Sequence, residues 1–551
     1  MINGKQLRDA FISGSNNLSN KRAEVDALNV FPVPDGDTGT NMSMTIGNGA
    51  KELLKLDDSV TVEEVSKVAA SAFLRGARGN SGVILSLLFR GFAKGLSGKT
   101  AATGADVANA FALGVEAAYK AVMKPTEGTI LTVSRCAAEK AAEIVKYDDS
   151  IVAVFYGMYL QSRRTLEQTP EMLPILKKSG VVDAGGQGLV YIMEGMWSVI
   201  SEGVMIPLKE ESDSSKAEVS AAGASDQDIR FTYCTETIID RAPVAKDPEV
   251  FRKFLASIGD SLVFVEDSSI IKIHVHTNDP GKVLTEALSY GSLATVKIEN
   301  MKIQHSSISG EDESIVKEEA APRFPYAEVD PSVEYGFVSV CAGSGLTAVF
   351  SDLGCDNIVS GGQTMNPSTE DILAAIQATP AKNVFVLPNN KNIIMAANQA
   401  AEIADRNVVV IPSRTVPQGV SAMLAYDPDA SVVDNTDAMN EALSSVATGQ
   451  VTFAARDSDF DGYKIEAGEL LAMKEGKMVY TGRDMDTICG RLAKALVTKD
   501  TSMVTIYYGE DVTEAQAEDI RAVIESKLPS SIEVSAIYGG QPVYYYIISA
   551  E

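Results

Sequence analysis

Apolar residues recur at helical spacing along the first two hundred residues of the chain. In Val62 to Phe73 and again in Val107 to Val122, apolar side chains return every three or four positions. This period places them on one face of an amphipathic helix. The pattern predicts an all-α first domain over residues 1–205.

Two segments interrupt this helical pattern. Asn29 to Thr40 contains two prolines and two glycines, and Arg75 to Gly82 contains three glycines. Both residue types favour turns and loops. Because loops carry a large share of functional residues, we expect the chemistry of the first domain in these two segments.

The pattern changes after the first domain. Residues 206–228 are rich in Ser, Ala, Glu and Asp without an apolar period, which is typical of a linker. Residues 229–305 then predict strand, helix, strand, strand, helix and strand, the order of a ferredoxin-like α+β domain. A second acidic linker is expected at 306–333.

From residue 334 to 551 short β-rich runs alternate with helical segments. Gly336 to Cys341, Val384 to Leu387 and Val408 to Ile411 are strand candidates, and their alternation with helices predicts an α/β domain with a parallel sheet. After Gln450 the runs become hairpin-like, so we expect a second lobe.

Charge and cysteine usage limit the classes of function. The 551 residues contain 48 Lys and Arg against 74 Asp and Glu, a net charge of −26, which disfavours nucleic acid and anionic membranes. The five cysteines form no CxxC pair, and the first twenty residues lack the apolar segment of a signal peptide. No apolar stretch is long enough for a membrane span. We expect a cytoplasmic protein without a transmembrane segment.

Asp35 and Asp37 stand two residues apart in the first interrupting segment. Prolines fix the backbone before them and glycines let it fold around a small cation. Magnesium prefers one or two carboxylates together with substrate phosphates, so this turn is a candidate magnesium site. The same residues also fit a solvated acidic turn that binds nothing.

Gly79-Asn-Ser-Gly82 precedes a predicted helix in the second segment. Glycines let backbone amides approach phosphate oxygens, and a helix N-terminus adds positive potential. The Gly-Lys-Ser/Thr ending of a P-loop is missing, so this signal is weak by itself.

Together, the two segments resemble the nucleotide-binding L domain of dihydroxyacetone kinases, and the whole chain resembles the kinase subunit of bacterial fatty acid kinases. The resemblance implies a helical barrel in which Asp35 and Asp37 hold two magnesium ions between the nucleotide phosphates. The dihydroxyacetone enzymes have a third aspartate just upstream, and the nearest candidate in this chain is Asn29, a neutral ligand. By the same resemblance the remaining nucleotide-binding residues are Thr38, Asn41, Met42, Gly79, Asn80, Ser81, Gly82, Thr129, Leu131, Asp183, Ala184 and Gly185.

The resemblance implies phosphorylation of a fatty acid carboxylate by ATP, giving an acyl phosphate for phospholipid synthesis. A carboxylate is ionised at neutral pH, with a pKa near about 4 to 5, and needs no general base. The fatty acid is expected on a separate carrier protein. Two alternatives remain open: a kinase for dihydroxyacetone or a similar small molecule, and a non-catalytic nucleotide-sensing scaffold.

His274 and His276 alternate with apolar residues on one predicted strand of the middle domain, so both share a face. In a ferredoxin-like sheet the first and third strands are neighbours. Cys234, on the first strand, is therefore expected beside the strand that carries the two histidines. One thiolate and two imidazoles form an open zinc set. Alternatively, the histidines are exposed polar residues and Cys234 a small core residue; the family resemblance favours zinc.

Ser360 to Thr369 and Val384 to Asn392 look like segments of the DegV-like fatty-acid-binding proteins, the partner subunits of these kinases. Where those proteins have a Ser-Gly-Thr turn, this chain has Pro388-Asn-Asn-Lys391. We therefore expect the C-terminal region to recruit the carrier, or a second copy of the chain as a homodimer, and not to hold lipid itself.

Overall fold

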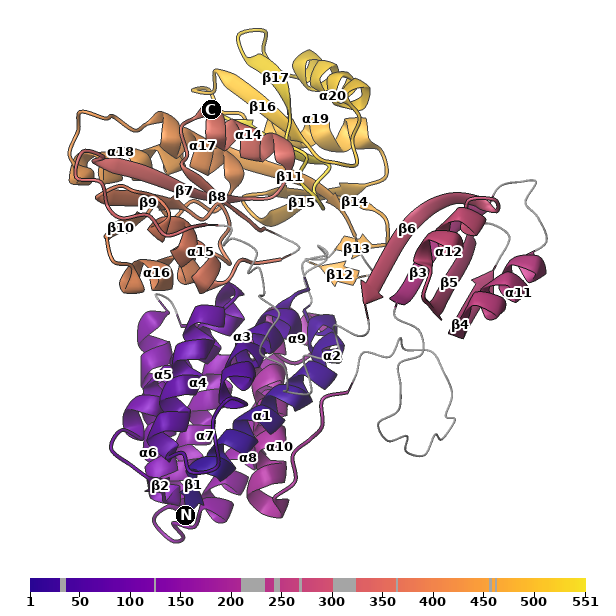
Figure 1. The fold of residues 1–551 in the computed structure, drawn as a ribbon. Helices are drawn as coiled ribbons and strands as arrows, with labels where there is room; N and C mark the ends of the chain where they lie inside the picture. The colour runs from indigo at the N-terminus through magenta and orange to yellow at the C-terminus, as the bar shows by residue number, and fades with distance from the viewer. Residues whose placement is uncertain are drawn as a thin grey trace. The chain divides into compact units, whose positions relative to one another are not determined.

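The computed structural model describes residues 1–29, 36–122, 125–209, 233–241, 248–266, 270–300, 324–362, 365–454, 458–460 and 463–551. These residues form two compact units, residues 1–212 with 322–551, and residues 213–321. The predicted fold class is confirmed: an all-α domain, a ferredoxin-like domain and an α/β region follow one another along the chain (Figure 1).

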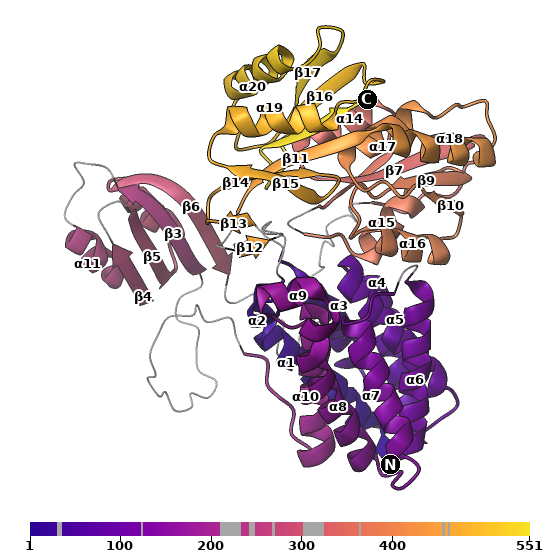
Figure 2. The same cartoon turned by 180° about the vertical axis from the view of Figure 1, so that it is seen from behind.

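The N-terminal domain is a closed ring of helices. Successive long helices pack side by side, and α10 closes the ring on α1; α6, α7, α8 and α10 lie next to one another in Figure 2. The elements are β1 Ile2–Asn3, α1 Gly4–Asn20, α2 Arg22–Ala27, α3 Thr38–Leu53, α4 Val62–Gly76, α5 Gly79–Gly95, β2 Ala101–Ala102, α6 Gly104–Ala121, α7 Ile130–Ile144, α8 Ile151–Met172, α9 Pro174–Ser179 and α10 Ala184–Glu202.

Capping residues mark the start of several of these helices. Thr61 caps α4 by accepting a hydrogen bond from the Glu64 amide, and the Glu64 carboxylate accepts a hydrogen bond from the Thr61 amide in return. This reciprocal pair satisfies two backbone donors that a helix start leaves unpaired. Thr103 and Asp106 repeat the arrangement at α6.

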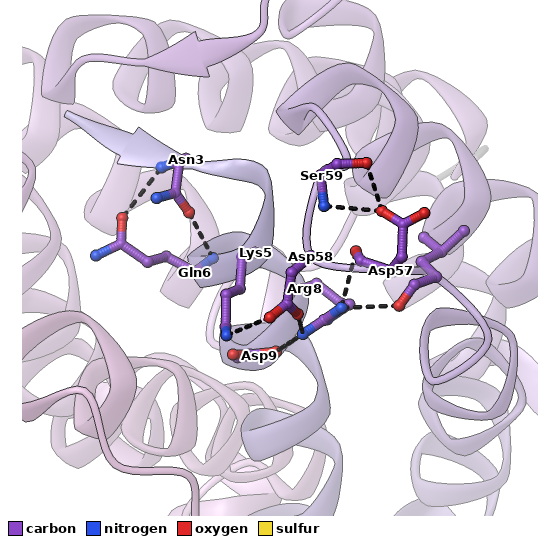
Figure 3. A network of polar contacts seen from close by, with 9 residues as sticks. Asn3, Lys5, Gln6, Arg8, Asp9, Asp57, Asp58 and Ser59 are labelled. Atoms are coloured by element: carbon purple, nitrogen blue, oxygen red, sulfur yellow. Dashed lines mark hydrogen bonds and ion pairs between the residues drawn. The ribbon is translucent and has the colours of Figure 1, made fainter.

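Arg8 of α1 binds the turn that follows α3. Its Nη1 donates to the carbonyls of Leu56 at 2.7 Å and Asp57 at 2.9 Å, and Nη2 lies 2.8 Å from Asp58 Oδ1 (Figure 3). The turn between α3 and α4 is thereby tied to α1.

The middle domain has the predicted ferredoxin-like topology. Its sheet has the order β4-β5-β3-β6 with antiparallel neighbours. Ile271, Ile273 and Val275 of β5 are fully buried in one core together with Phe251 of α11. The elements are β3 Tyr233–Arg241, α11 Pro248–Ile258, β4 Gly259–Glu266, β5 Ile270–Thr277, α12 Pro280–Ala287 and β6 Gly291–Asn300.

The C-terminal region contains two sheets. The first is parallel, with the order β10-β9-β7-β8. Its elements are β7 Tyr335–Cys341, α14 Ser344–Asp352, β8 Asn357–Ser360, α15 Thr369–Gln377, β9 Asn383–Leu387, α16 Ile394–Ile403 and β10 Asn407–Val410, followed by α17 Val416–Leu424 and α18 Val432–Ser445.

The second sheet is mixed and six-stranded, with the order β15-β14-β11-β18-β16-β17. Only the β16 and β17 pair is parallel among these described strands. Its elements, with a small hairpin β12–β13, are β11 Ala447–Phe453, β12 Ser458–Phe460, β13 Tyr463–Ile465, β14 Leu470–Lys474, β15 Lys477–Gly482, α19 Met485–Leu496, β16 Met503–Tyr508, α20 Glu514–Lys527, β17 Glu533–Tyr538 and β18 Tyr546–Ala550.

The barrel and the parallel sheet share one hydrophobic cluster. Buried residues of the barrel helices continue into Ile372 and Ile376 of α15 and Ala396 of α16. The Thr369 amide also donates to the carbonyl of Ala77 at 3.0 Å. The contact between these two domains is therefore both apolar and hydrogen-bonded, as in a domain interior.

Candidate active site

A cavity of about 460 Å³ lies at one end of the helical barrel, where four long helices and the short helix α9 begin. Helices joined by short connections run antiparallel, so alternate helices of the ring start at the same end. The residues from these four helix starts that line the cavity are Thr38 and Asn41 of α3, Asn80 and Ser81 of α5, Thr129, Ile130 and Leu131 at α7, and Ala184 and Gly185 of α10.

This convergence has an electrostatic consequence. The first amides of a helix lack intrahelical partners, and each helix start carries roughly half a positive charge. Four such starts around one cavity favour a polyanion, although the chain as a whole carries −26. The net charge of the chain therefore does not decide what this cavity binds.

Asp37 lies directly before α3 and lines the cavity. Its side chain makes no capping hydrogen bond to α3. Asp26 of α2 contacts the helix start instead, accepting from the Thr40 amide at 3.1 Å and from the Thr40 hydroxyl at 2.9 Å. Because Asp26 satisfies these donors, the Asp37 carboxylate is not needed to cap α3. Asp35, the other predicted carboxylate, lies outside the described residues.

The glycine-containing segment is shorter than the sequence indicated. We expected a loop over Arg75 to Gly82, but α4 continues to Gly76 and α5 begins at Gly79. Gly79 has φ of +56°, and a Cβ there would lie 2.6 Å from Asn41 Nδ2; at Gly82 it would lie 2.3 Å from Thr45 Oγ1. These two glycines let α5 pack closely on α3, which brings Asn80 and Ser81 to the cavity.

Asp183 is the N-cap residue directly before α10 and lines the same cavity. Its carboxylate accepts a hydrogen bond from the Gly186 amide at 2.7 Å. Burial raises the pKa of Asp183 to about 6, although backbone hydrogen bonds from Gly186 and Ile130 act in the opposite direction. Asp183 therefore titrates closer to neutral pH than an ordinary carboxyl.

Most predicted nucleotide-binding residues are brought together at this cavity. Its lining includes Asn29, Asp37, Thr38, Asn41, Asn80, Ser81, Thr129, Leu131, Asp183, Ala184 and Gly185. Gly79 and Gly82 act behind the lining through helix packing. Met42 differs from the expectation: its side chain is fully buried, and a Cβ at Gly188 would lie 2.7 Å from its Sδ. Met42 belongs to the barrel core because it follows Asn41 by one position, which turns its side chain by about 100° around the axis of α3.

Several residues at the site were not predicted for it. Ile175 and Leu176 of α9 add apolar surface, and Lys391 and Asn392 of the C-terminal region also line the cavity. Asn366, from the same region, donates its Nδ2 to Asp37 Oδ2 at 2.6 Å. The available sequence signal was a run of polar residues after a buried strand, as at Asn389 to Asn392.

The oxygen atoms at the cavity suit a magnesium ion. Asn80 and Asp37 line the cavity, and the Asn80 side-chain oxygen is buried without a hydrogen-bond partner. The side-chain oxygen of Asn366, which contacts Asp37 from behind the lining, is also buried without a partner. Magnesium prefers such oxygen donors together with substrate phosphates. No group of three His, Cys, Asp or Glu arranged as a metal site occurs within the described residues, which exclude Asp35.

The predicted zinc residues lie on neighbouring strands. Cys234 pairs with His276, and Glu236 with His274, in the register of β3 and β5. The expected adjacency of the first and third strands is thus present in the backbone. The side chains of Cys234, His274 and His276 lie outside the described residues, so the zinc set remains a prediction.

Comparison with known proteins covers almost the entire chain. Residues 32–198 match the DAK2 domain, residues 230–308 match the middle domain of the FakA-like fatty acid kinase family, and residues 336–551 match the C-terminal domain of that family. A protein of Bacillus subtilis, YloV, is 41% identical over 558 residues, with 100% of this chain and 99% of that protein covered.

This chain belongs to the FakA-like fatty acid kinase family. An uncharacterized Staphylococcus haemolyticus protein is also similar, with 40% identity over 557 residues, 100% of this chain and 99% of its own length. The predicted family is therefore confirmed.

Two solved structures resemble parts of this chain, each with a low TM-score. A DegV family protein, Cg2579 from Corynebacterium glutamicum, has a TM-score of 0.32 and 15% identity, covering 40% of this chain and 96% of its own. Dihydroxyacetone kinase from C. freundii, solved with AMP-PNP and Mg²⁺, has a TM-score of 0.28 and 19% identity, covering 35% and 33%. None of the described helices has the length and apolar character needed to cross a membrane.

Proposed function

We propose that this chain binds ATP with magnesium at the mouth of the helical barrel and transfers the terminal phosphoryl group to a fatty acid carboxylate. The observation that carries the proposal is the convergence of four helix starts beside Asp37. Membership of the FakA-like fatty acid kinase family supports the choice of acceptor.

The cavity has a polar part and an apolar part, which fit the two ends of ATP. Asn80 and Ser81 offer hydrogen-bond donors for the phosphates, while Ile175 and Leu176 offer apolar surface for the base. Asp37 and Asp35 would hold the metal ion. When bound, magnesium supplies positive charge that offsets the charge of the transferring phosphoryl group.

The reaction requires alignment more than proton transfer. A carboxylate oxygen forms a bond to the terminal phosphorus while the bridging phosphorus–oxygen bond to ADP breaks, which yields an acyl phosphate. An ionised carboxylate has no proton to lose, so the residues at the cavity need only bind, orient and exclude water.

We further propose that the fatty acid arrives on a separate, DegV-like carrier. The cavity beside Asn389 in the C-terminal region measures only about 60 Å³, whereas ligand pockets typically measure about 300 to 1,000 Å³. A second cavity of that region measures about 880 Å³, and its lining includes Arg414, Glu475 and Asp500, whose charges do not suit an acyl chain. Asn389 lines the smaller cavity. Its side chain donates a hydrogen bond to the Ser339 hydroxyl at 2.9 Å and accepts one from the Ser413 hydroxyl at 2.8 Å. A buried, hydrogen-bonded side chain leaves no room there for an acyl chain.

The middle domain is proposed to hold zinc through Cys234, His274 and His276. The pairing of Cys234 with His276 in the strand register supports this set. Bound there, zinc would join β3 to β5 and stabilise the domain.

The experiment is a reconstituted assay with the full chain, ATP, Mg²⁺, oleate and a DegV-like carrier, with hydroxylamine to trap acyl phosphate as hydroxamate. We expect hydroxamate only when the carrier is present. Asp37→Asn should abolish it, whereas Asp149→Asn, at an exposed position of the same domain, should retain it. Phosphorylation of dihydroxyacetone instead would favour the small-molecule kinase, and nucleotide binding without any product would favour the scaffold.

A further inference from the structure

The C-terminal region forms one wall of the candidate nucleotide cavity. Lys391 and Asn392 line it, and Asn80 at the start of α5 donates to Asn392 Oδ1 at 3.4 Å. Arg78 Nη1 donates to the carbonyl of Asn366 at 2.8 Å. These contacts hold the loops after β8 and β9 against the polar part of the cavity.

Asn366 is the most deeply buried of these residues, with 2% of its surface exposed. Its Nδ2 donates to Asp37 Oδ2 at 2.6 Å, while its Oδ1 is buried without a hydrogen-bond partner. A buried acceptor without a donor is costly, so such an atom is unusual away from ligand sites. Asn366 is thus oriented by one carboxylate oxygen and retains an oxygen that a bound ligand can satisfy.

Lys391 adds the charge that a triphosphate needs. Of the described residues that line this cavity, it alone is a Lys or Arg. Its neighbour Asn392 contacts Asn80, which places the Lys391 backbone near the start of α5. An ammonium group there can form charge-assisted hydrogen bonds to phosphate oxygens.

We propose that the C-terminal region completes the nucleotide site of the same chain, with Asn366 positioning Asp37 and Lys391 binding the terminal phosphate. This inference rests on the proposed function, since it assumes that the cavity binds ATP. It gives the DegV-like region a role in phosphoryl transfer besides any recruitment of the carrier.

The Lys391 test compares ATP and ADP binding by calorimetry in the presence of Mg²⁺. Lys391→Met should weaken ATP binding by about tenfold or more, as expected for loss of a charge-assisted hydrogen bond, and change ADP binding by less than about threefold. Lys391→Arg should restore most of the ATP affinity. Lys499→Met removes an exposed positive charge from the same region and should leave both affinities unchanged.

The Asn366 test measures the Mg²⁺ concentration that gives half-maximal ATP binding. Asn366→Ala should raise this concentration severalfold without changing the melting temperature by more than the Asn407→Ala control. Asn407 donates to Asn383 at 2.7 Å in the parallel sheet and is not part of the cavity lining. A role in domain packing alone would change the melting temperature and leave the Mg²⁺ dependence unchanged.

The outcomes separate this inference from the proposed function. If the natural chain binds no ATP, the proposed function fails. If it binds ATP and Lys391→Met retains the full preference for ATP over ADP, only the inference is overturned. An increase in phosphoryl transfer in Lys391→Met or Asn366→Ala would also overturn it, because the C-terminal region would then be obstructing the site.

Discussion

Arg78 and Asp371 connect the helical barrel to the C-terminal region, with 3.4 Å between Nη2 and Oδ2. Arg78 is mostly buried, with 19% of its side chain exposed. Asp371 also accepts a hydrogen bond from the Ser368 amide at 2.8 Å. The residue that precedes α5 is thereby joined to the residues that begin α15.

Arg78→Ala should lower the free energy of unfolding by about 2 kcal/mol, because it leaves the Asn366 carbonyl and Asp371 without a charged donor. Arg90 provides a matched control. It pairs with Glu402 across the same two domains at 3.4 Å, but 53% of its side chain is exposed. Arg90→Ala should cost less than about 0.5 kcal/mol. Chemical denaturation measures both, and equal losses would contradict a special role of Arg78.

Gly79→Ala should disturb the nucleotide site through packing as well as backbone strain. The new Cβ would meet Asn41, whereas at Gly98, which also has a positive φ of +77°, nothing lies within 4 Å. Gly98→Ala should therefore cost about 1 to 2 kcal/mol from the left-handed backbone alone. Gly79→Ala should cost more and also weaken ATP binding.

These two glycine variants are compared by denaturation and calorimetry. If Gly98→Ala weakened ATP binding as much as Gly79→Ala, the effect would come from general destabilisation and not from the cavity.

Asp183 predicts a specific dependence of stability on pH. Its pKa is raised from an ordinary value of 3.8 to about 6, so the folded state binds the proton more tightly than the unfolded state. Its contribution to stability is fully present below pH of about 4, and it is lost as pH rises to about 6. Asp183→Asn removes this titration while keeping a side chain that can cap α10.

The difference in unfolding free energy between Asp183→Asn and the natural chain should therefore grow in favour of the variant between pH 4 and 6 by about 1 to 2 kcal/mol, since the partial exposure of Asp183 reduces the full effect. Denaturation at a series of pH values measures it. A difference that does not change with pH would show that the Asp183 pKa is ordinary.

Zinc content tests the middle domain. We expect one zinc ion per chain in protein purified without chelators, because Cys234 and His276 pair in adjacent strands. Cys234→Ser should lose the metal, and Cys136→Ser, on α7, should keep it. Mass spectrometry under native conditions or elemental analysis gives the count. Zinc-free natural protein would end this proposal.

The sequence by itself determined the local structure and the family. Apolar periods near 3.6 and 2 specify which segments are helices and strands, since each depends on neighbours only a few positions away. The same local information identified the order of strands and helices in the middle domain.

Only the tertiary structure decided what surrounds Asp37. The antiparallel ring brings four helix starts to one cavity, and packing against α15 brings Asn366 to Asp37 across 329 positions. Met42, which directly follows the cavity residue Asn41 on α3, is directed into the core by the same packing. Contacts of this kind depend on which apolar faces meet, and a local sequence pattern specifies that a face is apolar without specifying its partner.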